Sequence, residues 1–113
     1  MSAAASDTGI RAAGAGRFEL YGDVNFQTAR SLRVAGLRLL QASSAAEMHI
    51  DCAHVRGANS AAVALFIDWL GWARGAGRSL NYERLPDNVR AIARISEVEE
   101  LLEAGIDARA QGG

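Results

Sequence analysis

The residues best placed for chemistry stand where a predicted strand gives way to a predicted helix. Residues 48–52 alternate apolar and polar side chains, which is the pattern of a half-buried strand. Apolar residues recur at helical spacing after Ser60, so either Asn59 or Ser60 is predicted to cap a helix. A cap stabilises a helix by about 1 kcal/mol, so Ser60 is either a structural cap or a hydroxyl offered to a partner.

A second candidate surface lies on the helix that begins there. The helix predicted over residues 60–76 has one apolar stripe for the sheet and a second, roughly opposite, formed by Leu65, Trp69 and Trp72. Neighbouring helices could cover this second stripe. If they do not, two tryptophans beside an exposed hydroxyl would anchor a protein interface. The sequence leaves both alternatives open.

No arrangement of residues indicates an enzyme or a metal centre. His49, Cys52 and His54 lack the spacing of a closed metal site, and there is no Ser-His-acid pattern or phosphate-binding glycine loop. Cys52 has the inward parity of its strand and is predicted to be core, whereas His49 is predicted to lie at the surface. We therefore expect no catalytic residue, no cofactor and no metal.

Length and composition favour one domain inside the cell. The chain has 113 residues, is 50% hydrophobic and contains one proline, which allows one core. The formal charge is −1 and the basic residues do not cluster, which argues against binding to nucleic acid or to a membrane surface. No segment resembles a membrane span or a secretion signal, so we expect a cytoplasmic protein.

Periodicity and turn residues predict a mixed α/β domain around the candidate site. The predicted strands are 10–13, 17–21, 48–52 and 79–83, and the predicted helices are 25–43, 60–76, 87–95 and 98–104. Ser96 and Glu99 have the spacing of a capping box for the last helix.

The order of these elements predicts the sheet. Helical connections make the last three strands parallel, and the first two form an antiparallel hairpin. Each of the three parallel strands has one apolar and one polar parity, so helices should cover one face of the sheet. We expect a mobile tail over residues 1–8, a folded domain over 9–104 and a flexible tail over 105–113.

The segment around Ser60 resembles the signature segment of STAS domains. It combines an Asp-led strand, a loop with Val at its fifth place and the run Asn-Ser-Ala-Ala-Val at residues 59–63. The segment from Phe18 to Val24 is similar to the family's opening strand and turn, and Leu101-Leu102 falls where its closing helix is apolar. The resemblance implies a STAS fold, with a small mixed sheet of four to five strands and helices mainly on one face.

Two groups of the family differ at the start of this helix. Anti-sigma-factor antagonists typically carry Asp-Ser-(Ser/Thr)-Gly, and a kinase phosphorylates the second hydroxyl. Here the four places read Asn59-Ser60-Ala61-Ala62, so Ala61 occupies the acceptor position and cannot take a phosphate. The MlaB group keeps one hydroxyl directly after the Asp/Asn position, as at Ser60, and residues 85–102 also resemble that group. This chain departs from the family pattern at two positions, where Asn59 replaces Asp and Ala62 replaces Gly.

Resemblance to the MlaB group implies a non-enzymatic subunit that supports or regulates the MlaF-like ATPase of a phospholipid ABC transporter. Such a complex contains a permease and maintains outer-membrane lipid asymmetry in Gram-negative bacteria. The subunit would be cytoplasmic and peripheral to the inner membrane through its partner, with no insertion of its own. The alternatives are an anti-sigma-factor antagonist in a partner-switching pathway and a STAS module of another complex. The expected partner-binding residues are Asn59, Ser60, Ala61, Leu65, Trp69 and Trp72.

Overall fold

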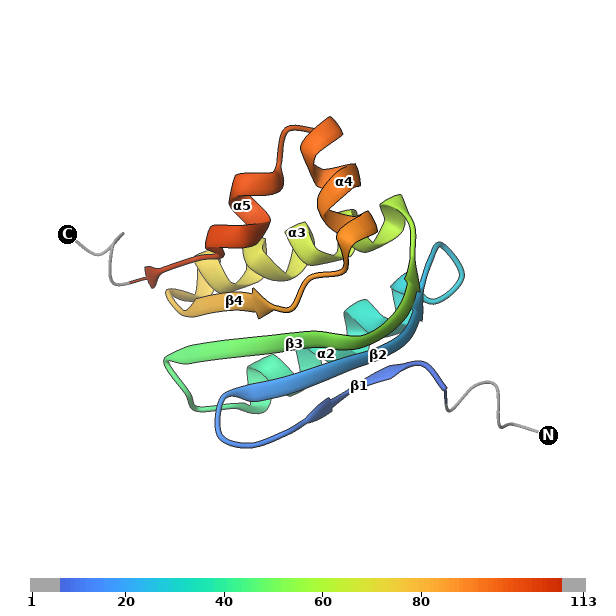
Figure 1. The fold of residues 1–113 in the computed structure, drawn as a ribbon. Helices are drawn as coiled ribbons and strands as arrows, with labels where there is room; N and C mark the ends of the chain where they lie inside the picture. Colours follow the sequence, from blue (N-terminus) through green and yellow to red (C-terminus); the bar gives the residue numbers. More distant parts are fainter. Residues whose placement is uncertain (1–6, 109–113) are drawn as a thin grey trace.

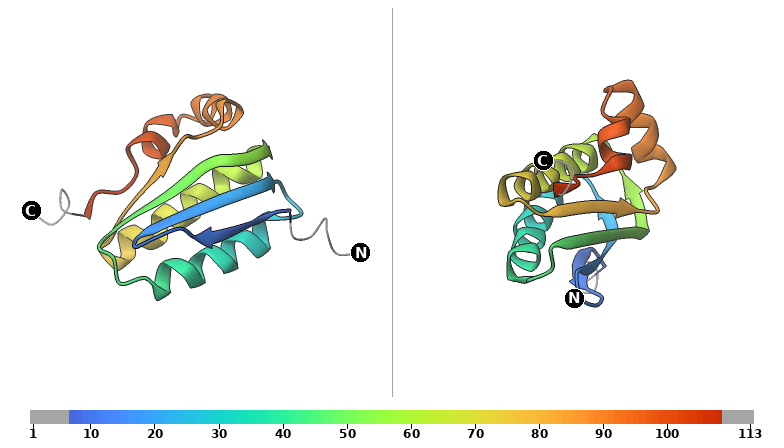
Figure 2. Two further views of the ribbon diagram at one scale, coloured as in Figure 1. Left: turned by 60° about the horizontal axis from the view of Figure 1, so that its bottom comes forward. Right: turned by 90° about the vertical axis from the view of Figure 1, so that its left-hand side faces the viewer.

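A four-stranded mixed sheet carries helices packed mainly on one of its faces (Figures 1 and 2). The computed structural model describes residues 7–108. In chain order the elements are β1 (Gly9–Ala12), β2 (Arg17–Val24), α2 (Ala29–Ala42), β3 (Glu47–Ala58), α3 (Ser60–Ala76), β4 (Ser79–Glu83), α4 (Asp87–Ile95) and α5 (Glu99–Ala104).

The sheet has the strand order β1-β2-β3-β4. β1 pairs antiparallel with β2, and the hairpin between them is closed by the Ala13 N–H, which donates to the Arg17 carbonyl at 2.8 Å. β2 and β3 are parallel, as are β3 and β4, because α2 and α3 return the chain to the opposite end of the sheet each time. The predicted mixed α/β sheet, with an antiparallel hairpin followed by parallel strands, is confirmed.

β3 is longer than the predicted strand. Residues 53–58 were expected to form a loop, but His54 to Ala58 pair with Tyr21 to Val24 of β2. β4 ends at Glu83, opposite Asp51, so the rest of β3 has a partner on one side only. Polar side chains are tolerated in this extension because most of it faces solvent, and the apolar alternation that marks a strand is therefore missing.

The core lies between one face of the sheet and the two helices α2 and α3. Leu20 of β2, Ile50 of β3 and Leu80 of β4 are fully buried and share the inward parity of their strands. Residues of the opposite parity, such as Glu19 and His49, remain partly accessible. The predicted division into a covered face and a polar face is confirmed, and Cys52 belongs to the core as expected.

α2 covers much of the second apolar stripe of α3. The Trp69 side chain is 0% exposed, its ring lies against Gly36 of α2, and its indole N–H donates to the Arg33 carbonyl at 3.4 Å. Leu65 is also buried in the core. The expectation that Leu65 and Trp69 form an exposed docking stripe is therefore wrong, because the neighbouring helix of the same domain covers them.

Trp72 is half-buried and is held by the residue that joins α3 to β4. The Arg78 guanidinium carbon lies 5.4 Å from the centroid of the Trp72 ring. The same guanidinium donates to the carbonyls of Leu40, Ser43 and Ala45, the last at 2.6 Å. A positive charge at the C-terminus of α2 is favourable because the free carbonyls there carry partial negative charge. Arg78 thus ties the end of α2 to the turn before β4.

Two predicted helix starts differ from those observed. α5 begins at Glu99 after Val98, with no side-chain cap, so the capping box of Ser96 and Glu99 is wrong. The Glu99 carboxylate instead accepts hydrogen bonds from Arg94 at 3.2 and 3.0 Å. The helix expected from residue 25 begins at Ala29, because the Asn25 side chain accepts the N–H groups of residues 27 and 28 and holds a turn there.

The described fold extends beyond the expected boundaries. Ile106 is buried and exchanges backbone hydrogen bonds with Leu80 at 2.8 and 2.9 Å, so it covers the open edge of β4. The hydroxyl of Thr8 accepts the N–H of Asp23. Both residues had been assigned to tails. Residues 1–6 and 109–113 of the expected tails lie outside the described part of the chain.

The contact between Trp69 and Gly36 predicts opposite effects of alanine at two helical glycines. A Cβ atom at Gly36 would lie 2.4 Å from the Trp69 ring, so Gly36→Ala should destabilise the fold by about 1–3 kcal/mol through overpacking. A Cβ atom at Gly71 of α3 meets nothing within 4 Å, so Gly71→Ala should stabilise by about 0.5–1 kcal/mol. Urea unfolding measures both. Stabilisation by Gly36→Ala would contradict the described packing.

Candidate functional site

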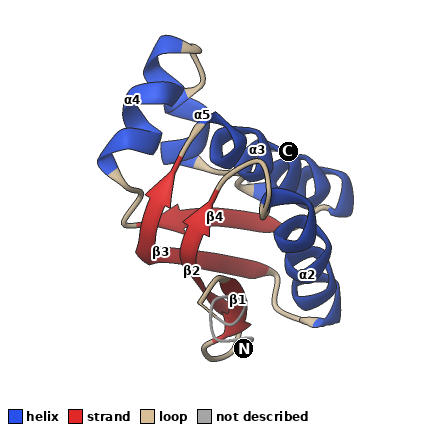
Figure 3. Ribbon diagram, turned by 90° about the vertical axis from the view of Figure 1, so that its right-hand side faces the viewer, coloured by secondary structure: helices blue, strands red, loops and turns tan. Residues whose placement is uncertain are grey.

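The three parallel strands all end on the same side of the domain, which Figure 3 views directly. β2 is followed there by Asn25 and Phe26, and β3 by Asn59 and Ser60. The carboxyl ends of parallel strands are the usual location of binding sites in α/β proteins, because the connecting segments can vary without disturbing the sheet. The candidate site is therefore built from the segments that enter α2 and α3.

Asn59 is the residue that caps α3. Its side-chain oxygen accepts the Ala61 N–H at 2.8 Å, and its own N–H donates to the Val24 carbonyl at 3.2 Å. The backbone of Asn59 is extended, as an N-cap requires, and the helix ends at Gly77 in the left-handed conformation. Of the two cap candidates in the sequence, the structure thus selects Asn59.

Ser60 is consequently free of a capping role. It is the first residue of α3 and is exposed, and its hydroxyl makes no hydrogen bond with any residue between 7 and 108. Ala61 follows it and is buried, so the helix surface next to the hydroxyl has little bulk. The hydroxyl stands at the positive end of the helix, where it can donate to or accept from a bound partner.

Phe26 is the residue at this site that sequence reasoning missed. It is 73% exposed, in the turn between β2 and α2. Together with α2 and α3 it lines a groove of about 240 Å³ that also contains Arg30, Ala61 and Ala64. The signal in the sequence was a large aromatic residue between Asn25 and Gln27, in a polar turn where no core position is available.

The structure separates the predicted site residues into two sets. Asn59, Ser60 and Ala61 lie together at the start of α3, as expected. Leu65 lines the groove but is buried, and Trp69 lies beneath α2. Trp72 is half-buried against Arg78 near the other end of α3, away from Ser60. An interface at the start of α3 therefore consists of the cap region and Phe26, without the tryptophan anchor.

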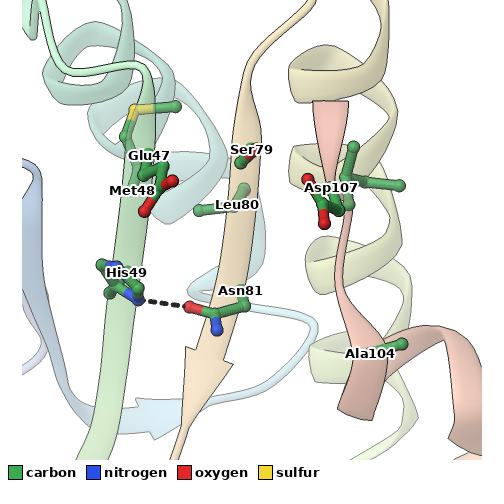
Figure 4. Close-up of a pocket in the computed structure, with 9 residues that line it drawn as sticks. Glu47, Met48, His49, Ser79, Leu80, Asn81, Ala104 and Asp107 are labelled. Atoms are coloured by element: carbon green, nitrogen blue, oxygen red, sulfur yellow. Dashed lines mark hydrogen bonds between the residues drawn. The ribbon is translucent and has the colours of Figure 1, made fainter. Parts of the chain in front are cut away.

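The polar face of the sheet is held by side-chain pairs. A pocket of about 150 Å³ is lined by residues of β3, β4 and the segment after α5, and His49 of β3 and Asn81 of β4 are hydrogen-bonded there (Figure 4). Among residues 7–108, no cluster of three or more His, Cys, Asp or Glu side chains could hold a metal ion. Other pairs that cross the sheet or join it to the following turn are Arg11–Glu19, Arg17–Glu83 and Arg84–Asp51.

Two adjacent residues of β3 have perturbed pKa values for structural reasons. The hydrogen bond from Arg84 lowers the pKa of the Asp51 carboxyl, which also accepts the Ala53 N–H at 2.9 Å. Burial raises the pKa of the Cys52 thiol to about 12, so the thiolate that a nucleophile requires does not form near neutral pH. Asp51 fixes the turn after β4, and Cys52 fills the core.

Comparison with known proteins assigns the chain to the family that the sequence resembles. The family model described as "Mlab, STAS domain" matches residues 9–103, which is most of the chain. This chain is a STAS domain of the MlaB type. No curated protein matches it. STAS domains are in general interaction modules without catalytic activity, so the exposed features at the start of α3 are best considered as parts of a protein interface.

The two residues at the start of this STAS domain's α3 should differ in their effect on stability. Asn59→Ala removes the bond to the Ala61 N–H and should lower the free energy of unfolding by about 1 kcal/mol. Ser60→Ala is the matched control and should change it by less than about 0.5 kcal/mol, since the hydroxyl is exposed. Urea titrations compare them. A larger loss from Ser60→Ala would show that Ser60 serves the fold.

The ion pair of Asp51 with Arg84 predicts a pH dependence. Because folding lowers the Asp51 pKa below its ordinary 3.8, the pair stabilises the STAS domain above that pH and the stabilisation is lost as pH falls through the folded pKa. Asp51→Asn should therefore destabilise the domain at pH 7, and its difference from the wild type should shrink below about pH 4. Thermal unfolding between pH 3 and pH 7 tests this. A constant difference would contradict the assignment.

Proposed function

We propose that this STAS domain is a non-enzymatic subunit that binds, and supports or regulates, the ATPase subunit of a phospholipid ABC transporter. Membership of the MlaB family supports this partner. The observation that carries the proposal is the exposed Ser60 hydroxyl at the start of α3, where the next residue, Ala61, lines a groove together with the exposed Phe26. We call the surface formed by Asn59, Ser60, Ala61 and Phe26 the Ser60 surface.

The Ser60 surface has the composition of a small protein interface. Phe26 offers a large apolar side chain, and exposed aromatic residues are frequent anchors of binding energy. Ser60 adds a polar contact, and Ala61 lets the partner come close to the helix. A polar group that loses its hydrogen bond inside an interface costs about 1–3 kcal/mol, so the partner must supply a matching group to Ser60.

This function places the subunit on the cytoplasmic side of the inner membrane, held there by its partner. No helix within residues 7–108 is long and apolar enough to cross a bilayer. In a permease-containing complex the subunit would contribute to the maintenance of outer-membrane lipid asymmetry through the ATPase, without inserting into the membrane itself.

Substitution of Ser60 tests the proposed interface. Ser60→Arg places a bulky charge in it and should weaken binding of the ATPase subunit at least about tenfold, because an unpaired charge is desolvated. Ser60→Ala should weaken it less than about fivefold, because only one polar contact is lost. Biolayer interferometry with the purified ATPase gives the affinities, and circular dichroism verifies folding. Unchanged binding of a folded Ser60→Arg variant would contradict the proposal.

An anti-sigma-factor antagonist is the second candidate function, and the exposure of the Ser60 hydroxyl is the observation that favours it. In that role a kinase partner would phosphorylate the hydroxyl and add a charge of about −2, which would switch the partner. Ala61 in the usual acceptor position argues against it. Intact mass measurement after incubation with a cognate anti-sigma kinase and ATP separates the two functions, because only the antagonist should gain a phosphate.

A further inference from the structure

We propose that the groove between α2 and α3 receives an acidic amphipathic helix of the partner, with a carboxylate opposite Arg30 and apolar side chains against Phe26. The inference rests on the proposed function and specifies the kind of segment that the ATPase would present. It is carried by the distribution of charge over the domain, by the unpaired state of Arg30 and by the shape of the groove.

Charge is divided unequally between the helical layer and the rest of the chain. α2 contains Arg30, Arg33 and Arg38 and no acidic residue, and α3 contains one acidic residue and one arginine. These two helices therefore carry a formal charge of +3, whereas the whole chain carries −1 and the remainder −4. A partner that meets the helical layer is favoured if its own surface is negative.

Of the two arginines that line the groove, Arg30 is the one whose positive charge is not paired with a carboxylate of residues 7–108. Arg33 lies 3.6 Å from Asp68 across the groove, so the one carboxylate that lines it already has a partner. Arg30 lines the same groove and has no ion pair or hydrogen bond with residues 7–108. A guanidinium in this position presents donors that match the two oxygens of a carboxylate.

A helix is a better occupant for the apolar part of the groove than a flat partner surface would be. The volume of the groove is about 240 Å³, and small side chains, among them Ala29, Ala61 and Ala64, line it together with Phe26 and Asp68. Alanines allow the backbone of a second helix to approach closely, while Phe26 packs against one of its apolar side chains.

Four variants of this domain, measured against the purified ATPase subunit, test the proposal. Arg30→Glu and Phe26→Ala should each weaken binding by about tenfold, since one reverses the complementary charge and the other removes the anchor. Asp68→Asn should tighten binding by about threefold, because it removes the repelling carboxylate and releases Arg33. Glutamate at position 30 lies in the first turn of α2, where it favours the helix, so folding is preserved.

Arg38→Glu is the matched control. It makes the same change in net charge on the same helix, but Arg38 does not line the groove, so binding should change by less than about threefold. If Arg38→Glu is as damaging as Arg30→Glu, the attraction is a general one and the groove assignment is overturned. Weaker binding of Asp68→Asn would overturn the predicted sign of the partner's charge.

The outcomes also separate this inference from the proposed function. If the ATPase binds the wild type, and Ser60→Arg and Phe26→Ala weaken binding while Arg30→Glu and Asp68→Asn bind like the wild type, the groove inference fails and the proposed function stands. If the wild type does not bind the ATPase, the proposed function fails. A titration of ¹⁵N-labelled protein with a synthetic Leu/Glu amphipathic helix then decides the groove: shifts at Phe26 and Ala64 support it, and their absence overturns it.

Two other occupants are distinguished by separate measurements. Sedimentation velocity of the free protein should show a monomer, and a dimer that Arg30→Glu dissociates would assign the groove to a second copy of this chain. Vesicles of phosphatidylcholine and phosphatidylglycerol should not co-sediment with the protein. Binding to these vesicles that Arg30→Glu and Arg38→Glu reduce equally would assign the basic layer to a membrane surface and overturn the proposal.

Discussion

The close approach of α2 and α3, set by Trp69 on the backbone of Gly36, is the contact on which the rest of this structure depends. The largest side chain of the core lies against a residue with no side chain, and the indole N–H is satisfied by the Arg33 carbonyl. The two helices therefore form one layer over the sheet. Their outer surfaces meet in a shallow groove, and the turn that carries Phe26 is fixed beside the start of α3.

The strand directions and much of the helix pattern could be predicted from the sequence, because local periodicity and end signals give the order of strands and helices along the chain, and helical connections make strands parallel. α3, α4 and β4 were predicted with the bounds observed. The extension of β3 could not be predicted, because polar residues in it are paired with β2 through backbone bonds that leave no mark on the side-chain pattern. The capping box failed because Arg94 competes for Glu99, and that ion pair depends on the turn between α4 and α5.

The candidate site was predicted in part. The spacing of Asn59 and Ser60 identified the start of α3, since capping is a local rule. Whether the Trp69 side chain is exposed or buried depends on the position of α2, which helical periodicity alone does not determine. Phe26 was missed because a single exposed aromatic residue in a turn has no periodic partner. The candidate site therefore lies at the beginning of α3, where the loops after the parallel strands meet, and not along the side of the helix as predicted.

The central claim is that the surface containing Ser60 and Phe26 contacts a transporter ATPase. Its most direct test is a photocrosslinking measurement with p-benzoylphenylalanine placed at Phe26, where an aromatic ring is already exposed, and separately at Ile95, which is 83% exposed at the end of α4. The account predicts a crosslink to the ATPase subunit from position 26 and none from position 95. A crosslink from position 95 alone would contradict it.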